Sequence, residues 1–408
     1  MAKAPAITRV GIVFSGGPAP AANAVISACA LSFLDVGVEV IGFLDGYAHI
    51  GTYRAGDALV EGTDYIRIRV GDVSGIRNRK SVLLRTSHAD PARGIESEAD
   101  LLDPAKNGGV TSILAAAEEL GLDALVSVGG DETLRTANHI YRYQQLVPCA
   151  KRLAVVHLPK TIDNDYHGID WTFGFVSAVD FAAREIRNIG ADGNSTNAWY
   201  VLELMGRQAG WMTYAAGIAG EATKMMSVEE VDGFFDPDAF ALEIAHLMIQ
   251  REAVGKNYGI VCVAEGLASM LPGDDPQVDP SGYSLLGSAH IAERIAKATE
   301  VAYERLSGRK VRVRSKQIGY EARCAEPVAF DILLGSQLGV GAFRALADGV
   351  DGCMVSVKDQ LQLINVPFSQ LVDPETLCTR VRYVPLDSDF YRLAKALEYG
   401  GERDARRR

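Results

Sequence analysis

The sequence predicts an α/β protein in which mainly parallel sheets are flanked by helices. Short apolar, β-rich runs alternate with segments of helical periodicity, which is the pattern of a parallel sheet covered by helices. Most of these runs end in glycine or in a polar cluster, as strands do before a loop. Because a chain of 408 residues is too long for one ordinary compact core, we expect two lobes.

Six runs are predicted to be strands and five segments to be helices. The strands are expected at residues 10–14, 38–43, 124–128, 153–158, 199–204 and 260–264. The helices are expected at residues 19–34, 110–120, 177–189, 240–250 and 288–306. A polar segment with Gly and Pro, 269–283, is predicted to be a surface loop or lid. Ligands bind beyond the carboxyl ends of parallel strands, so functional residues are expected directly after the runs.

The composition is typical of a globular protein in a reducing compartment. A net charge of -11 disfavours general binding to nucleic acid or to anionic membranes. The six cysteines are scattered and form no CxxC pair, so neither a zinc site nor a disulfide framework is indicated. No stretch approaches the roughly 20 apolar residues that span a bilayer. The N-terminal residues lack the features of a signal peptide, and we expect a cytoplasmic protein.

Two glycine-containing turns are candidates for phosphate binding. Gly16 and Gly17 follow the first predicted strand, where glycine lets the backbone approach a ligand and a helix N-terminus favours an anion. In the second turn, 129–132, Asp131 and Glu132 follow two glycines. Adjacent carboxylates repel each other unless a cation or basic side chain is near, which favours a Mg²⁺ site beside a phosphate. A ligand-free turn or a simple helix cap is the alternative for each motif.

The segment after the predicted strand at 153–158 contains a lysine and two carboxylates. Lys160 and Thr161 precede Asp163 and Asp165. A carboxylate within reach of a sugar hydroxyl can accept its proton, and a nearby lysine stabilises charge on a transferring phosphoryl group. Ordinary turn chemistry, in which Asp and Asn side chains bind their own backbone, is the alternative. Three phosphate-compatible strand ends in one chain weigh against it.

Two further predicted strands are followed by residues that suit a sugar phosphate. Arg207 can hold phosphate oxygens in a bidentate geometry, and the carboxylate of Glu265 can accept hydrogen bonds from sugar hydroxyls. A basic run around Arg314 precedes Tyr320 and Arg323 and suits a phosphate. The alternative for this basic run is a solvated edge strand.

Six motifs, taken together, carry a resemblance to a known family. In chain order they are Gly16-Gly17-Pro18-Ala19-Pro20, Gly129-Gly130-Asp131, Thr161-Ile162-Asp163-Asn164-Asp165, Met205-Gly206-Arg207, Glu265-Gly266 and Gly319-Tyr320-Glu321-Ala322-Arg323. The chain resembles the 6-phosphofructokinase family, of the pyrophosphate-dependent type, over roughly residues 8–355. Six motifs in order are far more specific than any one of them.

This resemblance implies two Rossmann-like, three-layer lobes of the phosphofructokinase fold. Residues 1–174 and 328–385 would form a phosphoryl-donor lobe, and residues 175–327 a sugar-phosphate lobe. Residues 386–408 would form a C-terminal helix and a charged tail. The active site is expected in the cleft between the lobes, in a homodimer or homotetramer.

The same resemblance implies reversible phosphoryl transfer from pyrophosphate to the 1-hydroxyl of fructose 6-phosphate. It makes Asp163 the general base and Asp131 a ligand of Mg²⁺, and it adds Lys160, Glu132 and Arg207 to the catalytic residues. Substrate binding falls to a larger set, namely Gly16, Gly17, Thr161, Asp163, Asp165, Met205, Gly206, Arg207, Glu265, Arg314, Tyr320 and Arg323.

The donor is inferred from Glu132 and Lys160. Family members that use ATP usually carry glycine at both positions, whereas members that use pyrophosphate carry a carboxylate and a lysine. A carboxylate would repel the α-phosphate of a nucleotide, and a lysine would pair with the short donor. An ATP-dependent enzyme and a non-catalytic sugar-phosphate-binding regulatory subunit are the alternative interpretations.

Three departures from the family pattern concern both substrates. Ala21 stands where glycine is expected, and the run Arg85-Thr86-Ser87-His88 stands where Gly-Thr-Ser-Arg is common. The stretch Ser195-Thr196-Asn197-Ala198-Trp199, upstream of Met205, lacks the arginine that in many relatives reaches the 6-phosphate of the sugar. Either Arg314 and Arg323 suffice for this phosphate, or the acceptor is another sugar phosphate such as sedoheptulose 7-phosphate.

Overall fold

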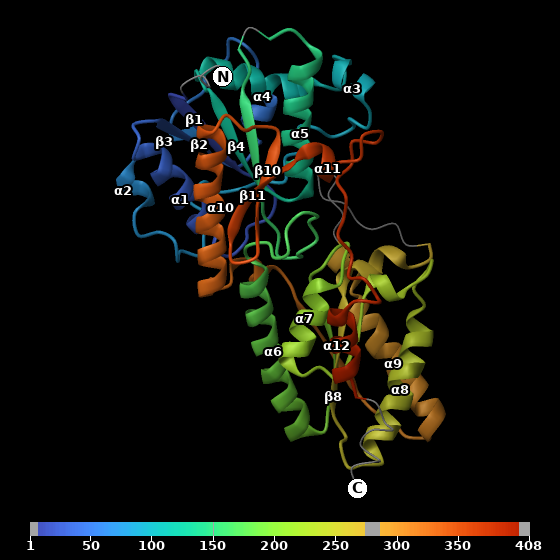
Figure 1. Ribbon diagram of the computed structural model, residues 1–408. Helices are drawn as coiled ribbons and strands as arrows, with labels where there is room; N and C mark the ends of the chain where they lie inside the picture. Colours follow the sequence, from blue (N-terminus) through green and yellow to red (C-terminus); the bar gives the residue numbers. More distant parts are fainter. Residues whose placement is uncertain (1–6, 150, 274–285, 400–408) are drawn as a thin grey trace. The chain divides into compact units, whose positions relative to one another are not determined.

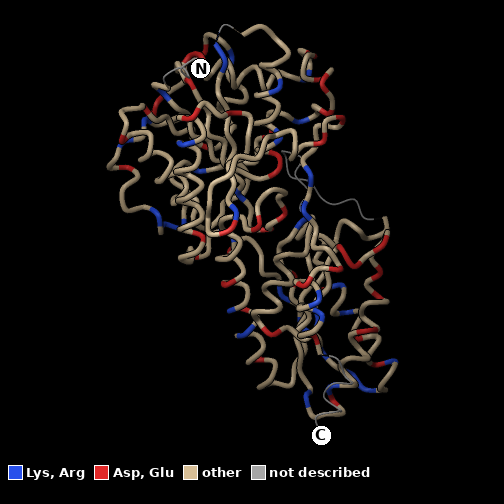
Figure 2. Tube along the Cα trace, viewed as in Figure 1, with Lys and Arg blue, Asp and Glu red and all other residues tan. Residues whose placement is uncertain are grey.

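The computed structural model describes residues 7–149, 151–273 and 286–399, and the chain divides into two compact units (Figure 1). Unit 1 comprises Met1–Ile162, Tyr166–Val176 and Arg323–Val381. Unit 2 comprises Asp163–Asp165, Ser177–Ala322 and Arg382–Arg408. Basic and acidic residues are interspersed along both units (Figure 2). Within the described residues, no helix is long and apolar enough to cross a membrane.

Unit 1 is built on a seven-stranded sheet with the order β11-β10-β5-β4-β1-β2-β3. The strands are β1 (Arg9–Phe14), β2 (Glu39–Phe43), β3 (Tyr65–Ile68), β4 (Ala124–Gly129), β5 (Ala154–Pro159), β10 (Cys353–Lys358) and β11 (Gln362–Pro367). The edge strands β3 and β11 are antiparallel to their neighbours, and the other pairs are parallel. Strand β4 is buried along its whole length, as expected for a parallel strand covered on both faces.

Two pairs of helices cover the sheet of unit 1. Helix α1 (Ala22–Leu34) packs against α10 (Ala329–Ala347), and α4 (Gly108–Glu119) packs against α5 (Asp131–Leu146). The two pairs lie on opposite faces of the sheet, so unit 1 has three layers (Figure 1). The shorter elements are η1 (Ile50–Thr52), α2 (Val70–Val73), α3 (Glu98–Leu102) and α11 (Phe368–Leu371). The chain passes from unit 2 to unit 1 within η5 (Tyr320–Cys324).

Unit 2 is built on a parallel sheet with the order β7-β8-β6-β9. Its strands are β6 (Trp199–Leu204), β7 (Lys224–Met226), β8 (Gly259–Ala264) and β9 (Val313–Ile318). Its helices are α6 (Phe175–Thr196), α7 (Trp211–Gly220), α8 (Pro237–Glu252), α9 (Ile291–Ser307) and α12 (Asp389–Leu397). The short 3-10 helices are η2 (Val228–Glu230), η3 (Glu265–Met270) and η4 (Leu286–Ala289). An apolar core fills the space between α8, α9 and strands β6 and β8.

The structure confirms the predicted α/β class with mainly parallel sheets. Sequence reasoning missed β3, β7, β10, β11 and α10. Helix α10 was hidden because its glycines lower helix propensity. One of them, Gly339, is needed for packing, since a Cβ atom there would lie 2.6 Å from the carbonyl oxygen of Val25 in α1. Of the predicted loop at 269–283, residues 274–283 lie outside the described residues.

The boundaries of the two units differ from the predicted lobes in four stretches, 163–165, 175–176, 323–327 and 382–385. The turn Asp163–Asp165 and the chain from Arg382 onward both lie in unit 2, because Arg382 hydrogen-bonds to the carbonyl groups of this turn. Arg323 lies in unit 1 instead of the sugar-phosphate lobe, where its guanidinium group contacts the Gly17 turn.

Candidate active site

The turn after β1 brings together residues from three distant segments of unit 1. Gly16 has a φ of +81°, and a Cβ atom there would lie 3.0 Å from Nζ of Lys160. A Cβ atom on Gly17 would lie 3.0 Å from the guanidinium carbon of Arg323. Both cations therefore sit directly against the glycine turn. An anion bound to the backbone of this turn would meet two positive side chains.

The segment Thr86–Ser87 holds the same turn from the other side. The amide of Gly16 donates to the carbonyl oxygen of Ser87 at 2.9 Å, and the hydroxyl of Thr86 donates to the carbonyl oxygen of Gly16. Strand β4 adds a third contact, because the amide of Ser15 donates to Val128 O at 2.9 Å. The peptide groups on either side of Gly16 are thus fixed by residues far away in the sequence.

The end of β4 places two carboxylates on the first turn of α5. Asp131 and Glu132 begin this helix, where the helix dipole favours negative side chains. A Cβ atom on Gly129 would lie 2.3 Å from the side chain of Thr133, so glycine is required there. The amide of Lys160 donates to Gly129 O at 2.9 Å, which places the end of β5 beside this turn.

These carboxylates fit a magnesium ion only together with phosphate oxygens. Mg²⁺ is commonly held by one or two carboxylates plus substrate phosphates, and Asp131 with Glu132 supplies that number. Over the ranges that the structure describes, no group of three or more His, Cys, Asp or Glu could hold a metal ion by protein ligands alone.

A chain of buried hydrogen bonds supports the Gly129 turn, and sequence reasoning missed it. The hydroxyl of Tyr166 donates to Gly129 O at 2.9 Å and lies 3.1 Å from Nε2 of His157. Nδ1 of His157 lies 3.4 Å from Oγ of Ser127, which lies 3.0 Å from the hydroxyl of Tyr47. Burial lowers the pKa of His157 to about 3. The neutral imidazole can therefore donate from Nε2 to Tyr166 and accept at Nδ1. The only signal in the sequence was a histidine within an apolar predicted strand.

The predicted base lies on a turn that Arg382 holds in unit 2. In the turn Asp163–Asp165, Asn164 adopts a left-handed φ of +55°. Arg382 donates from Nη2 to Asn164 O at 2.7 Å and from its amide to Asp165 O at 2.8 Å. Its guanidinium carbon lies 4.7 Å from the centroid of the Trp211 ring, and Nε1 of Trp211 donates to Arg382 O at 2.8 Å. Sequence reasoning did not identify Arg382.

The carboxyl ends of β6 and β8, which are neighbouring parallel strands, bring together Gly206, Arg207 and Glu265. The amide of Gly206 lies 3.4 Å from Oε1 of Glu265, and the amide of Gly266 donates to Gly206 O at 3.2 Å. A Cβ atom on Gly266 would lie 2.5 Å from Arg207 O. The two loops therefore touch through their backbones, and Met205 is buried beside them.

Arg314 is not brought to these loops within unit 2. It is the second residue of β9, an edge strand parallel to β6, so it lies near the end of the sheet opposite to Met205 and Glu265. Its guanidinium group lies 3.0 Å from the carboxylate of Asp192 and 2.5 Å from the hydroxyl of Tyr200. This arrangement is that of a solvated edge strand.

Two other predicted substrate residues lie in different surroundings. Tyr320 begins η5 and is 65% exposed. Thr161 precedes the unit boundary, and its carbonyl oxygen accepts a hydrogen bond from the buried hydroxyl of Thr172 at 2.7 Å. The carbonyl of Thr161 is therefore engaged in fixing the chain next to Lys160.

The sequence and the fold of this chain are similar to those of known proteins. The phosphofructokinase family model matches residues 9–346. A pyrophosphate--fructose 6-phosphate 1-phosphotransferase of Thermotoga maritima is 32% identical, covering 95% of this chain and 89% of the relative. An ATP-dependent 6-phosphofructokinase of Chloroflexus aggregans is 33% identical, covering 95% and 96%. A pyrophosphate-dependent phosphofructokinase structure from Marinobacter aquaeolei is similar with a TM-score of 0.70 and 15% identity, covering 97% of this chain and 92% of that one. At that identity the likeness shows a common fold.

Proposed function

Because the chain belongs to the phosphofructokinase family, we propose that it transfers a phosphoryl group reversibly from pyrophosphate to the 1-hydroxyl of fructose 6-phosphate. The observation that carries this proposal is the position of Lys160. Its side chain is only 5% exposed, and Nζ lies against the Gly16 turn. Since opposite charges attract strongly at short range away from bulk water, the ammonium group would bind the phosphates of a short donor held on this turn.

Overall identity does not choose between the two donors. A relative named for pyrophosphate is 32% identical and one named for ATP is 33% identical. Two side chains support pyrophosphate. Lys160 compensates the charge of the donor and of the departing phosphate, and Glu132 on the first turn of α5 would repel the α-phosphate of a nucleotide.

The proposed reaction is an in-line displacement at phosphorus. Asp163 accepts the proton of the sugar hydroxyl while the oxygen of this hydroxyl attacks the near phosphorus atom of pyrophosphate. The bond from this phosphorus to the bridging oxygen breaks, and phosphate leaves with the bridging oxygen. Lys160 and Arg207 neutralise the phosphoryl oxygens during the transfer. The fixed turns around Asp163 and Gly16 would keep these groups oriented before the substrates bind.

Magnesium is part of the proposal. Asp131, on the first turn of α5, would hold the ion together with oxygen atoms of the donor. When bound, the ion supplies positive charge that offsets the negative charge of the transferred group.

The acceptor is supported by the loops at the ends of β6 and β8. Glu265 would accept hydrogen bonds from sugar hydroxyls, and Arg207 and Arg323 would bind phosphate oxygens. Ala198 supplies no cation for the phosphate of the sugar. Because Arg314 lies near the opposite end of the unit 2 sheet, it could contribute only from a second copy of the chain. We therefore include a homodimer or homotetramer in the proposal, to be checked by sedimentation velocity. A reversible reaction of this kind would serve both glycolysis and gluconeogenesis in the cytoplasm.

A four-way assay tests donor and acceptor together. The purified protein with excess Mg²⁺ is given pyrophosphate or ATP, each with fructose 6-phosphate or sedoheptulose 7-phosphate, and products are identified by phosphorus NMR. We expect fructose 1,6-bisphosphate from pyrophosphate and fructose 6-phosphate. Turnover with ATP alone would contradict the donor. Turnover of sedoheptulose 7-phosphate alone would contradict the acceptor, and no turnover with any pair would favour a non-catalytic protein.

A double variant tests the residues behind the donor assignment. Lys160→Gly with Glu132→Gly removes both proposed determinants, so the kcat/KM for pyrophosphate should fall by about 100-fold or more, as for loss of a charge that stabilises the transition state. Glu119→Gln, at the end of α4, is a control for the loss of one surface carboxylate. Unchanged use of pyrophosphate by the double variant would exclude both residues as determinants.

A further inference from the structure

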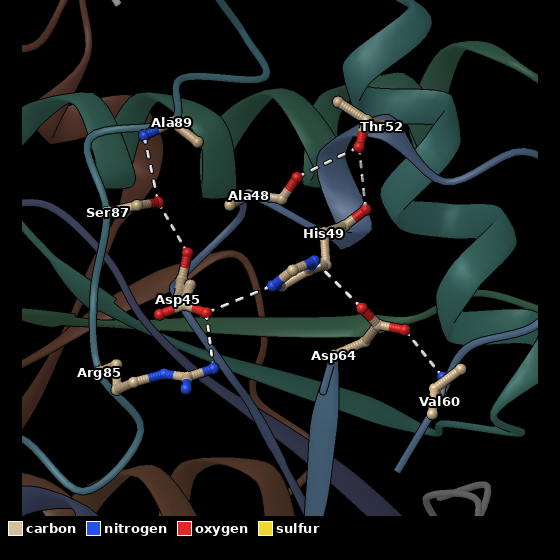
Figure 3. Close-up of polar contacts among 9 residues, drawn as sticks. All are labelled: Asp45, Ala48, His49, Thr52, Val60, Asp64, Arg85, Ser87 and Ala89. Carbon is tan, nitrogen blue, oxygen red and sulfur yellow. Dashed lines mark hydrogen bonds and ion pairs between the residues drawn. The ribbon is translucent and has the colours of Figure 1, made fainter. Parts of the chain in front are cut away.

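Asp45 and Arg85 face each other at the edge of the unit 1 sheet that carries the Gly16 turn (Figure 3). Asp45 follows β2, and its Oδ2 lies 2.7 Å from Nη2 of Arg85. The same oxygen lies 3.3 Å from Nε2 of His49, whose Nδ1 lies 3.0 Å from Oδ1 of Asp64. The carboxylate of Asp45 is thus shared by a guanidinium group and an imidazole ring.

The backbone at both ends of this ion pair is unusual. Asp45 and Arg85 each have a φ of +55°, a left-handed conformation that aspartate adopts more readily than arginine. Three contacts join the two loops. The amide of Asp45 donates to Leu84 O at 3.0 Å, the hydroxyl of Ser87 donates to Asp45 O at 2.6 Å, and the ion pair is the third. An arginine therefore stands where glycine would fit more easily, and its guanidinium group makes one of the three contacts.

The residues that follow Arg85 bind the peptide groups of the Gly16 turn. The hydroxyl of Ser87 donates to Asp45 O, and the carbonyl oxygen of Ser87 accepts a hydrogen bond from the amide of Gly16 at 2.9 Å. Thr86, the neighbour of Arg85, donates to Gly16 O. The loop after β2 also reaches the turn directly, because a Cβ atom on Gly46 would lie 3.0 Å from Oγ of Ser15. A shift of the Arg85 loop would therefore move Gly16.

We propose that Arg85, through its ion pair with Asp45, is a positioning residue for the phosphoryl donor. The pair fixes the segment Thr86–Ser87, and this segment sets the orientation of the peptide groups around Gly16. The inference rests on the proposed function, in which the Gly16 turn binds the phosphates of the donor. Loss of the pair should weaken the binding of the donor and leave the acceptor loops of unit 2 unaffected.

Two variants remove the pair without breaking the backbone. Arg85→Gly deletes the guanidinium group and keeps a residue that adopts positive φ freely. Asp45→Asn removes the charge and keeps a residue that tolerates the left-handed conformation. We expect either variant to raise the KM for pyrophosphate by about two- to fivefold, the upper part of the range for loss of one partly exposed ion pair. The KM for the sugar phosphate and the melting temperature should stay at their wild-type values.

The double variant and a matched control sharpen the test. Asp45→Asn with Arg85→Gly should raise the KM for pyrophosphate no further than either single change, because both remove the same interaction. Arg67→Ala removes another exposed arginine of unit 1, which pairs with Glu61 and Glu39 on the edge of the sheet. It should leave the KM for pyrophosphate unchanged.

The failure of this inference is distinguishable from failure of the proposed function. If the wild-type protein turns over pyrophosphate and the single variants keep its KM, the inference is wrong. It is also wrong if the variants lower the melting temperature and raise both KM values together, since that marks a general structural role. If the wild-type protein uses ATP instead, the proposed donor is wrong, and the KM for ATP of the same variants tests the positioning role.

Discussion

The Nζ atom of Lys160 lies 3.0 Å from the point that a Cβ atom on Gly16 would occupy. Gly16→Ala should therefore displace the ammonium group, and it also forces alanine into a φ of +81°. We expect the kcat/KM for pyrophosphate to fall by about 100-fold, as when a charged group near the transferred phosphoryl is lost. Steady-state kinetics with a saturating sugar phosphate measure this.

Gly75→Ala is the matched control for this change. Gly75 has a similar φ of +71°, and a Cβ atom there would have no heavy atom within 4 Å. The control shares the backbone strain of about 1 kcal/mol but not the contact with Lys160. Equal losses of kcat/KM in both variants would mean that strain alone, and not Lys160, explains the effect at Gly16.

The base assignment predicts that Asp163→Asn separates binding from turnover. The amide cannot accept the hydroxyl proton, so kcat should fall by about 10²- to 10⁴-fold. Binding of fructose 6-phosphate, measured by calorimetry, should stay within about threefold of wild type, since an amide keeps hydrogen-bonding capacity. Asp35→Asn, at the exposed C-terminal end of α1, is the control for loss of one aspartate and should keep the wild-type kcat. A wild-type rate in Asp163→Asn would exclude this residue as the base.

Arg382 lies outside the site predicted from the sequence, and we expect its replacement to lower the rate of the reaction. Arg382→Met removes the hydrogen bonds to Asn164 O and the cation over the Trp211 ring. Because small displacements of a catalytic group are costly, kcat should fall by about tenfold or more. The emission of Trp211 should shift as its neighbour changes. Arg380→Met is the control on an exposed neighbour, and a normal kcat in Arg382→Met would show that the turn holds its shape unaided.

The parts of the site that could be predicted are those at strand ends. Gly16 and Lys160 lie just after β1 and β5, Gly129 is the last residue of β4, and the carboxyl ends of such neighbouring parallel strands meet at one edge of a sheet. Their positions at strand ends could be predicted from the apolar runs, whereas the neighbouring order of β5, β4 and β1 is known only from the structure. Arg314 shows the limit of this reasoning, because only the direction of β9 reveals that it lies near the other end of the sheet.

The parts that could not be predicted depend on contacts between distant segments. Arg382 binds Asn164 across 218 positions through a carbonyl oxygen, and Thr86 binds Gly16 across 70 positions in the same manner. Every residue offers a carbonyl group, so the sequence carries no mark of which one is bound. Helix α10 was missed for a related reason. Its glycines obscure the helical pattern, and the need for them lies in packing against α1, which is far away in the sequence.

Stability should fall on acidification because His157 is buried as a neutral ring. Its pKa is lowered from 6.5 to about 3 by burial, so between these values the unfolded chain binds a proton that the folded chain does not. The contribution of His157 is therefore fully present above pH 6.5 and is lost as the pH falls toward 3. From pH 7 to pH 5 the loss amounts to about 2 kcal/mol in the free energy of unfolding. Burial also lowers the pKa of His139 to about 3. This ring adds a similar loss in the free energy of unfolding, both in the wild-type protein and in each His157 variant.

His157→Gln isolates the share of this one ring. Glutamine can donate to Tyr166 and accept from Ser127, but it takes up no proton. Urea unfolding at pH 7, 6 and 5 should show that the variant loses about 2 kcal/mol less than wild type on acidification. Tyr166→Phe is the control, because it removes a hydrogen bond from the same chain without removing the titrating ring. It should be less stable at every pH while keeping the wild-type slope. If His157→Gln also kept that slope, the ring would have to be charged in the folded protein, and its neutral hydrogen-bond chain to Gly129 would be wrong.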